Sequence, residues 1–96
     1  MTETQRVVEQ IRKAKPTLLE EYGVSRIGYF GSHAKGKSTP TSDIDVLVDF
    51  SRPIGWKFFD LKDFLEELVG KDVDLVTSCS LKKRLKDSIL KEVVFI

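Results

Sequence analysis

The chain has 96 residues, of which 16 are Lys or Arg, 15 are Asp or Glu and 41% are hydrophobic, so its length suffices for one domain with one modest core. Its near-neutral charge argues against a bulk nucleic-acid binder, whose phosphate contacts need a clustered cationic excess. No apolar run approaches the roughly 18 residues of a membrane span, the N-terminus lacks the apolar stretch of a signal peptide, and the single Cys79 fits a reducing compartment. We therefore expect a single cytoplasmic domain over residues 1–96, with no membrane contact and no direct nucleic-acid binding.

Residues 1–23 predict two helical segments separated by a proline. Their apolar positions recur at helical spacing and are Val7, Val8, Ile11, Leu18, Leu19 and Tyr22. Thr2 or Thr4 can cap the first segment. Pro16 disfavours helix at the residue before it and suits the first turn of a second, short helix. Gly23 then ends that helix as a left-handed C-terminal cap.

Two strands with a loop between them follow. Residues 24–30 predict a strand that ends at Gly31, and residues 31–42 (GSHAKGKSTPTS) predict a loop because they are small and polar. Residues 43–50 alternate between the two faces of a strand. The apolar face consists of Ile44, Val46, Val48 and Phe50, and the other of Asp43, Asp45, Leu47 and Asp49. The alternation predicts a strand with one buried face.

The second half of the chain predicts a helix, a short strand and a last helix. Apolar residues fall at helical intervals over residues 56–69, and Gly70 closes that helix. Residues 73–77 predict a third strand, and Ser80 can cap the final helix. The stripe that this helix would bury is Leu81, Leu85, Ile89, Leu90, Val93 and Val94. The element order predicts an α+β domain of two layers (α/β-like), with a small mixed sheet of about three strands flanked by helices.

Two aspartates on the same side of the second strand carry the strongest chemical signal. Asp43 and Asp45 are two residues apart, which places them about 7 Å apart along one face of a strand. Like charges repel, and aspartate is a poor strand former, so the pair is costly unless a cation binds. Magnesium takes carboxylate oxygens together with water and phosphates, and paired ions clamp the attacking and leaving oxygens in nucleotidyl transfer. The pattern therefore predicts a metal site for phosphoryl or nucleotidyl transfer.

Gly31 and Ser32 have the features of a phosphate-binding loop. A glycine at a strand end lets the backbone approach a ligand, and free N–H groups after it can face an anion. The Ser32 hydroxyl adds a donor, and Lys35 and Lys37 add positive charge. The stretch GSHAKGKS also satisfies the Walker A pattern, which needs a long helix after it. Pro40 and the next strand leave no room for that helix, so we reject the P-loop interpretation.

The stretch GSHAKGKSTPTSDIDVLVDF resembles the GS-x10-DxD signature of the DNA polymerase β-type nucleotidyltransferases. It is most similar to the minimal nucleotidyltransferase group, whose members are usually antitoxins paired with HEPN-domain toxins. The segments KPTLLEEYGVSRIGYF, LKDFLEELVGKDVDLV and LKKRLKDSILKEVV also resemble this group, so the resemblance covers nearly the whole chain from about Lys15. It implies the polymerase β-type nucleotidyltransferase fold.

The resemblance implies a role for each matched residue. Gly31 and Ser32 would hold the nucleotide triphosphate, and Lys35 stands where the family commonly has an arginine, which keeps the charge but loses bidentate contact. The aspartates that would ligate two Mg²⁺ ions and carry catalysis are Asp43, Asp45 and Asp74. Asp74 would complete the metal site and help to deprotonate the attacking hydroxyl.

The reaction that the resemblance implies is transfer of AMP from ATP to a tyrosine hydroxyl of a partner HEPN toxin. The chain would then be a protein adenylyltransferase and the antitoxin of a type VII-like toxin–antitoxin pair, in a hetero-oligomer with the toxin. A domain this small has little surface left to orient an acceptor, which favours an acceptor presented by another protein. Two alternatives stay open: an antitoxin of weak catalysis that neutralises its toxin by binding, and a small-molecule nucleotidyltransferase like those that modify aminoglycosides.

Several other residues invite a functional interpretation. His33, the single histidine, lies in the loop, but only its location supports a role as general base. Asp49 is expected to be a surface charge or a salt-bridge partner. The basic residues of 82–86 predict the solvated face of an amphipathic helix, with a partner or nucleotide contact as the alternative. The aromatic side chains of 56–59 are expected to pack in the core, with an exposed docking patch as the alternative.

Overall fold

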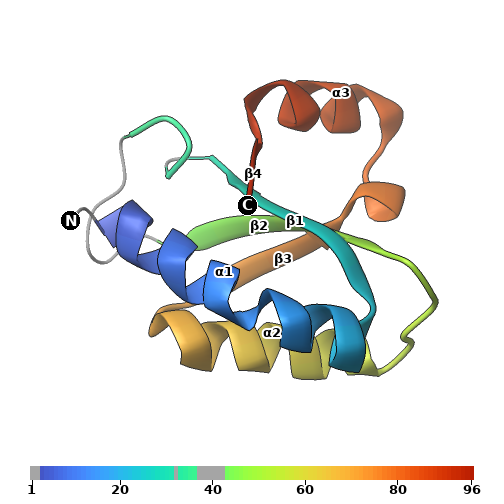
Figure 1. Cartoon of the computed structure of the whole chain (residues 1–96). Helices are drawn as coiled ribbons and strands as arrows, with labels where there is room; N and C mark the ends of the chain where they lie inside the picture. Colours follow the sequence, from blue (N-terminus) through green and yellow to red (C-terminus); the bar gives the residue numbers. More distant parts are fainter. Residues whose placement is uncertain (1–2, 32, 37–42) are drawn as a thin grey trace.

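The computed structural model describes residues 3–31, 33–36 and 43–96, in which three α-helices and four strands are present (Figure 1). In chain order the elements are α1 (Glu3–Tyr22), β1 (Val24–Phe30), β2 (Ile44–Phe50), α2 (Lys57–Val69), β3 (Val73–Thr77), a 3-10 helix (Ser78–Ser80), α3 (Lys83–Glu92) and β4 (Val94–Phe95). Thr2, Ser32, Lys37 and Pro40 lie outside the described residues. None of the described helices is long and apolar enough to cross a bilayer.

The strands form one mixed sheet in the order β3-β2-β1-β4. Strand β1 pairs antiparallel with β2, whereas β2 and β3 are parallel because helix α2 crosses over between them. Strand β4 pairs antiparallel with β1 at Gly28 and Tyr29. The predicted α+β class and mixed sheet are confirmed, with four described strands where about three were expected.

The additional strand β4 (Val94–Phe95) includes Val94, which the helical spacing had assigned to the last helix. Gly28 permits its approach, because a Cβ atom at that position would lie only 2.8 Å from the carbonyl oxygen of Val94. The ladder continues past the strand, since the Ile96 N–H donates to the carbonyl oxygen of Ile27 at 2.9 Å. Pairing of this kind depends on a distant strand, so local periodicity could not predict it.

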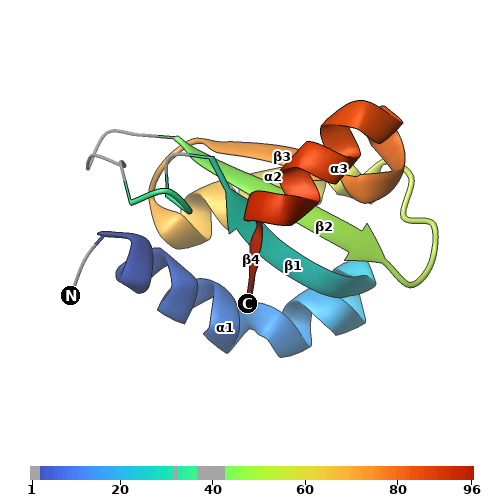
Figure 2. The ribbon, with the colours of Figure 1, turned by 90° about the horizontal axis from the view of Figure 1, so that it is seen from above.

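Helices α1 and α2 cover one face of the sheet, and α3 lies on the other side (Figures 1 and 2). The core fills the space between the sheet and the first two helices. It contains the predicted apolar face of β2 from Ile44 to Val48, together with Val7, Ile11, Ala14, Leu18, Val24, Ile27, Leu61, Leu65, Val69, Val73 and Leu75. The alternation in β2 therefore turns its aspartates away from this core, toward the side of the sheet on which α3 lies and on which Leu47 is also buried.

Helix α1 runs through Pro16 without a break, so the prediction of two helical segments is wrong. A proline inside a helix removes one backbone hydrogen bond and crowds the preceding turn, at a cost of about 3 kcal/mol. Ala14 and Leu18, on either side of Pro16, are both buried, whereas Pro16 faces solvent. Burial of the apolar stripe along the whole helix outweighs the local penalty.

The last helix begins later and packs less than predicted. Ser80 does not cap it; instead the Ser80 N–H donates to the Thr77 side chain, which caps a 3-10 turn, and α3 starts at Lys83. No residue of α3 is buried, and Leu85 is 54% exposed. The expected buried stripe is therefore wrong, and α3 remains largely solvated.

The core packing predicted for residues 56–59 is also wrong for two of the three aromatic side chains. Trp56 is 85% exposed and Phe59 57% exposed. Phe58 precedes the buried Leu61 by three residues, shares its helix face and packs against the core. Phe59 precedes Leu61 by two residues and so points to the opposite side.

Leu65→Ala is expected to lower the free energy of unfolding by about 3 kcal/mol, because Leu65 is completely buried between α2 and the sheet. Urea denaturation followed by circular dichroism measures the change. Leu85→Ala is the matched control, since the same atoms are removed from an exposed site, and its effect should stay within about 0.5 kcal/mol. Equal losses at the two positions would contradict the core described above.

Candidate active site

Asp45 and Asp74 are direct neighbours on the face of the sheet opposite α1 and α2. They are register partners on the parallel strands β2 and β3. Burial is the main cause that raises the pKa of Asp45, followed by the charge of Asp74 and a hydrogen bond between the two carboxyl groups. The charges of Asp43 and Glu92 raise the pKa of Asp45 as well. The fold thus concentrates negative charge where it is costly, which is typical of a functional site.

An open pocket of about 500 Å³ surrounds this pair. Its lining consists of Asp43, Asp45, Lys62, Glu66, Asp72, Val73 and Asp74. Glu66 accepts a hydrogen bond from the Val73 N–H at 3.0 Å and pairs with Lys62 at 3.7 Å, so it ties α2 to the start of β3. Lys62, Glu66 and Asp72 were not predicted from the sequence. The signal that could have found them is the parallel pairing, which sets the start of β3 beside the start of β2.

The acidic residues fit a hard divalent cation by their chemistry. Carboxylate oxygens are the ligands that Mg²⁺ prefers, and an ion between Asp45 and Asp74 would offset the repulsion that raises the pKa of Asp45. Asp43, which is exposed at the edge of β2, lines the same pocket. In the described part of the chain, no three acidic, histidine or cysteine side chains are already arranged around one point as metal ligands. Asp74 acts on Asp45 through a hydrogen bond and its charge, and Asp43 acts on Asp45 through its charge.

Gly31 brings the loop backbone against Asp45. Its φ of +73° is a conformation that side chains other than that of glycine rarely adopt, and a Cβ atom there would overlap the carboxylate oxygen Oδ2 of Asp45. The turn continues with a hydrogen bond from the Lys35 N–H to the Gly31 carbonyl oxygen at 3.1 Å. The predicted phosphate-binding glycine and the predicted metal-binding aspartate are therefore adjacent, although Ser32 lies outside the described residues.

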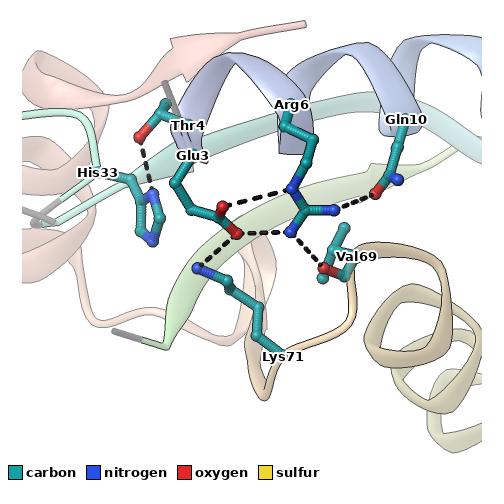
Figure 3. A network of polar contacts seen from close by, with 7 residues as sticks. All are labelled: Glu3, Thr4, Arg6, Gln10, His33, Val69 and Lys71. Atoms are coloured by element: carbon teal, nitrogen blue, oxygen red, sulfur yellow. Dashed lines mark hydrogen bonds and ion pairs between the residues drawn. The ribbon is translucent and has the colours of Figure 1, made fainter. Parts of the chain in front are cut away.

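His33 anchors this loop to the start of α1 (Figure 3). The side chain is only 3% exposed, and a 2.9 Å hydrogen bond joins its Nδ1 to Oγ1 of Thr4. Thr4 therefore lies within α1 as a partner of His33, not as the helix cap that the sequence predicted. Burial of the imidazole and its hydrogen bond to Thr4 support a structural role for His33.

A network of charges beside His33 joins α1 to the end of α2 (Figure 3). Arg6 donates to the Val69 carbonyl oxygen at 3.1 Å and pairs with Glu3. Lys71, whose side chain is 7% exposed, lies 3.1 Å from Glu3. Hydrogen bonds from Arg6 and then from Lys71 lower the pKa of Glu3 to about 2. These contacts hold the first turn of α1, and with it the loop, near the acidic pocket.

Asp49 shares the face of Asp45 but belongs to a separate salt bridge, as predicted. Its Oδ2 lies 2.7 Å from Arg26, and its Oδ1 accepts a hydrogen bond from Ser78. Burial alone would raise the pKa of Asp49, but the hydrogen bonds from Ser78 and Arg26 lower it overall. The basic residues of 82–86 lie mostly exposed at the start of α3, which confirms the predicted solvated face.

Comparisons with known proteins show the family of the chain. The family described as "Nucleotidyltransferase domain" matches residues 11–96. The protein adenylyltransferase MntA of Thermococcus cleftensis is 44% identical over 91 residues, which cover 93% of this chain and 92% of the relative. A Methanocaldococcus jannaschii protein assigned as a protein adenylyltransferase is 42% identical over 88 residues, 90% of either chain.

Solved structures show the same fold. A structure assigned as a minimal nucleotidyltransferase is 34% identical, has a TM-score of 0.76 and is matched over 91% of this chain and 90% of its own. A toxin–antitoxin complex with AMP-PNP contains a chain that is 22% identical, with a TM-score of 0.68 over 96% of this chain and 70% of that one.

The fold is that of the polymerase β-type nucleotidyltransferases, as the signature had suggested. The chain belongs to the nucleotidyltransferase domain family and is a nucleotidyltransferase, similar to the minimal members of that family.

Proposed function

We propose that the chain transfers AMP from ATP to a tyrosine hydroxyl of a partner HEPN toxin and thereby acts as its antitoxin. The observation that carries the proposal is the close approach of Gly31, which follows β1, to Asp45, the register partner of Asp74. It combines a backbone that can approach phosphate with a place for a divalent cation.

The comparisons support the partner and the nucleotide. The similar Thermococcus cleftensis protein is named a protein adenylyltransferase. Structures with this fold include a toxin–antitoxin complex with AMP-PNP and an MntA–HepT toxin–antitoxin complex. A protein adenylyltransferase needs a side-chain acceptor on another protein, and a tyrosine hydroxyl of a toxin would be such an acceptor.

We assign the steps of the reaction to residues as follows. Gly31, Ser32 and Lys35 would bind the triphosphate, and Mg²⁺ held by the three aspartates, Asp43, Asp45 and Asp74, would supply charge neutralisation on the phosphates. Asp74 is exposed, so an incoming tyrosine can reach its carboxylate, which accepts the phenol proton. The tyrosine oxygen forms a bond to the α-phosphorus, the bond to the bridging β-phosphate oxygen breaks, and diphosphate leaves.

Intact mass spectrometry tests the proposal. This protein, ATP and Mg²⁺ are incubated with the small helical product of the neighbouring reading frame, which is the expected toxin. We expect that product to gain the mass of an AMP group, and to gain nothing when a chelator is present or when its acceptor tyrosine is replaced by phenylalanine. AMP on a free aminoglycoside without any partner would support the small-molecule alternative instead, and no transfer to any acceptor would contradict the proposal.

A further inference from the structure

Glu92, the last residue of α3, engages two groups of the loop that follows β1. Its Oε1 accepts a hydrogen bond from the Gly31 N–H at 3.3 Å, and its Oε2 lies 3.5 Å from the Lys35 ammonium. These are two of the groups to which we assigned triphosphate binding. A carboxylate offers them what a phosphate offers, namely a negative charge and acceptor oxygens.

The pairing of β4 with β1 fixes the position of Glu92. In this antiparallel ladder Tyr29 faces Val94. Gly31 directly follows β1, and Glu92 lies two residues before Val94, so the pairing of the two strands brings Gly31 and Glu92 into the same region. The pairing of β4 with β1 therefore brings the end of α3 close to Gly31, although no residue of α3 is buried.

Glu92 lies in an electrostatically unfavourable place apart from these two contacts. The C-terminal end of a helix is the negative end of its dipole, which disfavours a carboxylate. Burial and Asp74 contribute most to the raised pKa of Asp45, and the charge of Glu92 raises it further. The carboxylates of Glu92 and Asp45 therefore repel each other. The contacts with Gly31 and Lys35 are what offset this cost.

We propose that the Glu92 carboxylate occupies the phosphate-binding groups of the protein, namely the Gly31 N–H and the Lys35 ammonium, and must leave them when a nucleoside triphosphate binds. This inference rests on the proposed function, because it takes Gly31 and Lys35 as triphosphate-binding groups. The Gly31 N–H has one proton to donate, so it cannot serve both anions at full strength, and the two anions repel each other. Nucleotide uptake is then a competition with an internal carboxylate, which lowers the affinity of the resting site.

Glu92→Gln tests the competition, since it preserves the shape of the side chain and removes its charge. We expect the variant to bind inorganic triphosphate and ATP about three- to tenfold more tightly than the natural chain, as measured by calorimetry. Asp87→Asn is the matched control, because it removes one negative charge from an exposed position on the same helix. It should change the affinity by less than twofold.

The amide resonance of Gly31 provides a readout that needs no nucleotide. In ¹H–¹⁵N spectra of the nucleotide-free protein, Glu92→Gln should shift this resonance, and Asp87→Asn should leave it in place. Equal or weaker triphosphate binding by Glu92→Gln would overturn the inference and make Glu92 a support of the loop. If the natural chain binds neither triphosphate nor ATP, the proposed function fails. The change in the Gly31 amide resonance on Glu92→Gln still shows whether Glu92 accepts a hydrogen bond from that amide.

Discussion

Asp45→Asn is expected to lower the rate of AMP transfer about a thousandfold or more and, at neutral pH, to raise the melting temperature of the protein. The loss of activity follows from the removal of a charged ligand, because charge neutralisation at the phosphates is worth several kcal/mol and each 1.36 kcal/mol is a factor of ten in rate. Single-turnover transfer of AMP to the partner, followed by intact mass, measures it.

The gain in stability follows from the raised pKa of Asp45. Burial and the neighbouring Asp74 make the folded protein favour the protonated form more than the unfolded chain does. The stability linked to protonation is fully present below the unfolded pKa and is lost as the pH rises through the raised folded pKa. The ionised carboxylate therefore destabilises the fold at neutral pH, and asparagine removes that cost.

Thermal unfolding at pH 7 and in acid separates the stability change that comes from ionisation of Asp45 from changes that do not depend on pH. We expect the advantage of Asp45→Asn at pH 7 to shrink toward zero below the unfolded pKa of an aspartate. Asp63→Asn, at an exposed position on α2, is the control and should show no comparable gain at either pH. A lower melting temperature for Asp45→Asn at pH 7 would contradict the description of the acidic pair.

The same variant separates enzymatic antitoxin action from neutralisation by binding. If Asp45→Asn loses AMP transfer and also fails to protect cells from the partner toxin, transfer is the mechanism of protection. Full protection without transfer would favour the binding alternative. Because the substitution is expected to stabilise the fold at neutral pH, unfolding would not explain a failure to protect.

The parts of the fold that follow from local patterns could be predicted from the sequence. The alternation over residues 43–50 located β2 and its polar face, and Gly70, with a φ of +73°, ends α2 as expected. These features depend on the pleat of one strand and on the conformational freedom of one glycine. The contact of Asp45 with Asp74 needed the parallel register of β2 and β3, which only the resemblance to a known family implied.

The features that were not predicted depend on distant contacts. Nothing near Val94 in the sequence indicates that it pairs with Tyr29, and the role of Glu92 follows from that pairing. Pro16 is a local signal for a break, and packing on both sides of it outweighs that signal. The sequence therefore located the aspartates of the candidate site, but not the carboxylate that competes for its loop.

Gly31→Ala is expected to cost about 2 kcal/mol of folding stability and to reduce nucleotide binding more than tenfold. Two separate effects add at this position. A side chain at a φ of +73° strains the backbone, and the added Cβ atom would overlap Oδ2 of Asp45. Relief of the overlap must move either the loop or the carboxylate, and both are part of the proposed nucleotide site.

Gly36→Ala separates the two effects, because Gly36 has a φ of +72° and no described atom lies within 4 Å of a Cβ built there. It should show the backbone strain alone, about 1 kcal/mol, and keep nucleotide binding within a few-fold of the natural chain. In an Asp45→Ala background the overlap is gone, so Gly31→Ala should cost no more there than Gly36→Ala does. Chemical denaturation of the single and double variants measures these differences. An undiminished cost of Gly31→Ala without the Asp45 carboxylate would show that the glycine is needed for its backbone conformation and not for its approach to that acid.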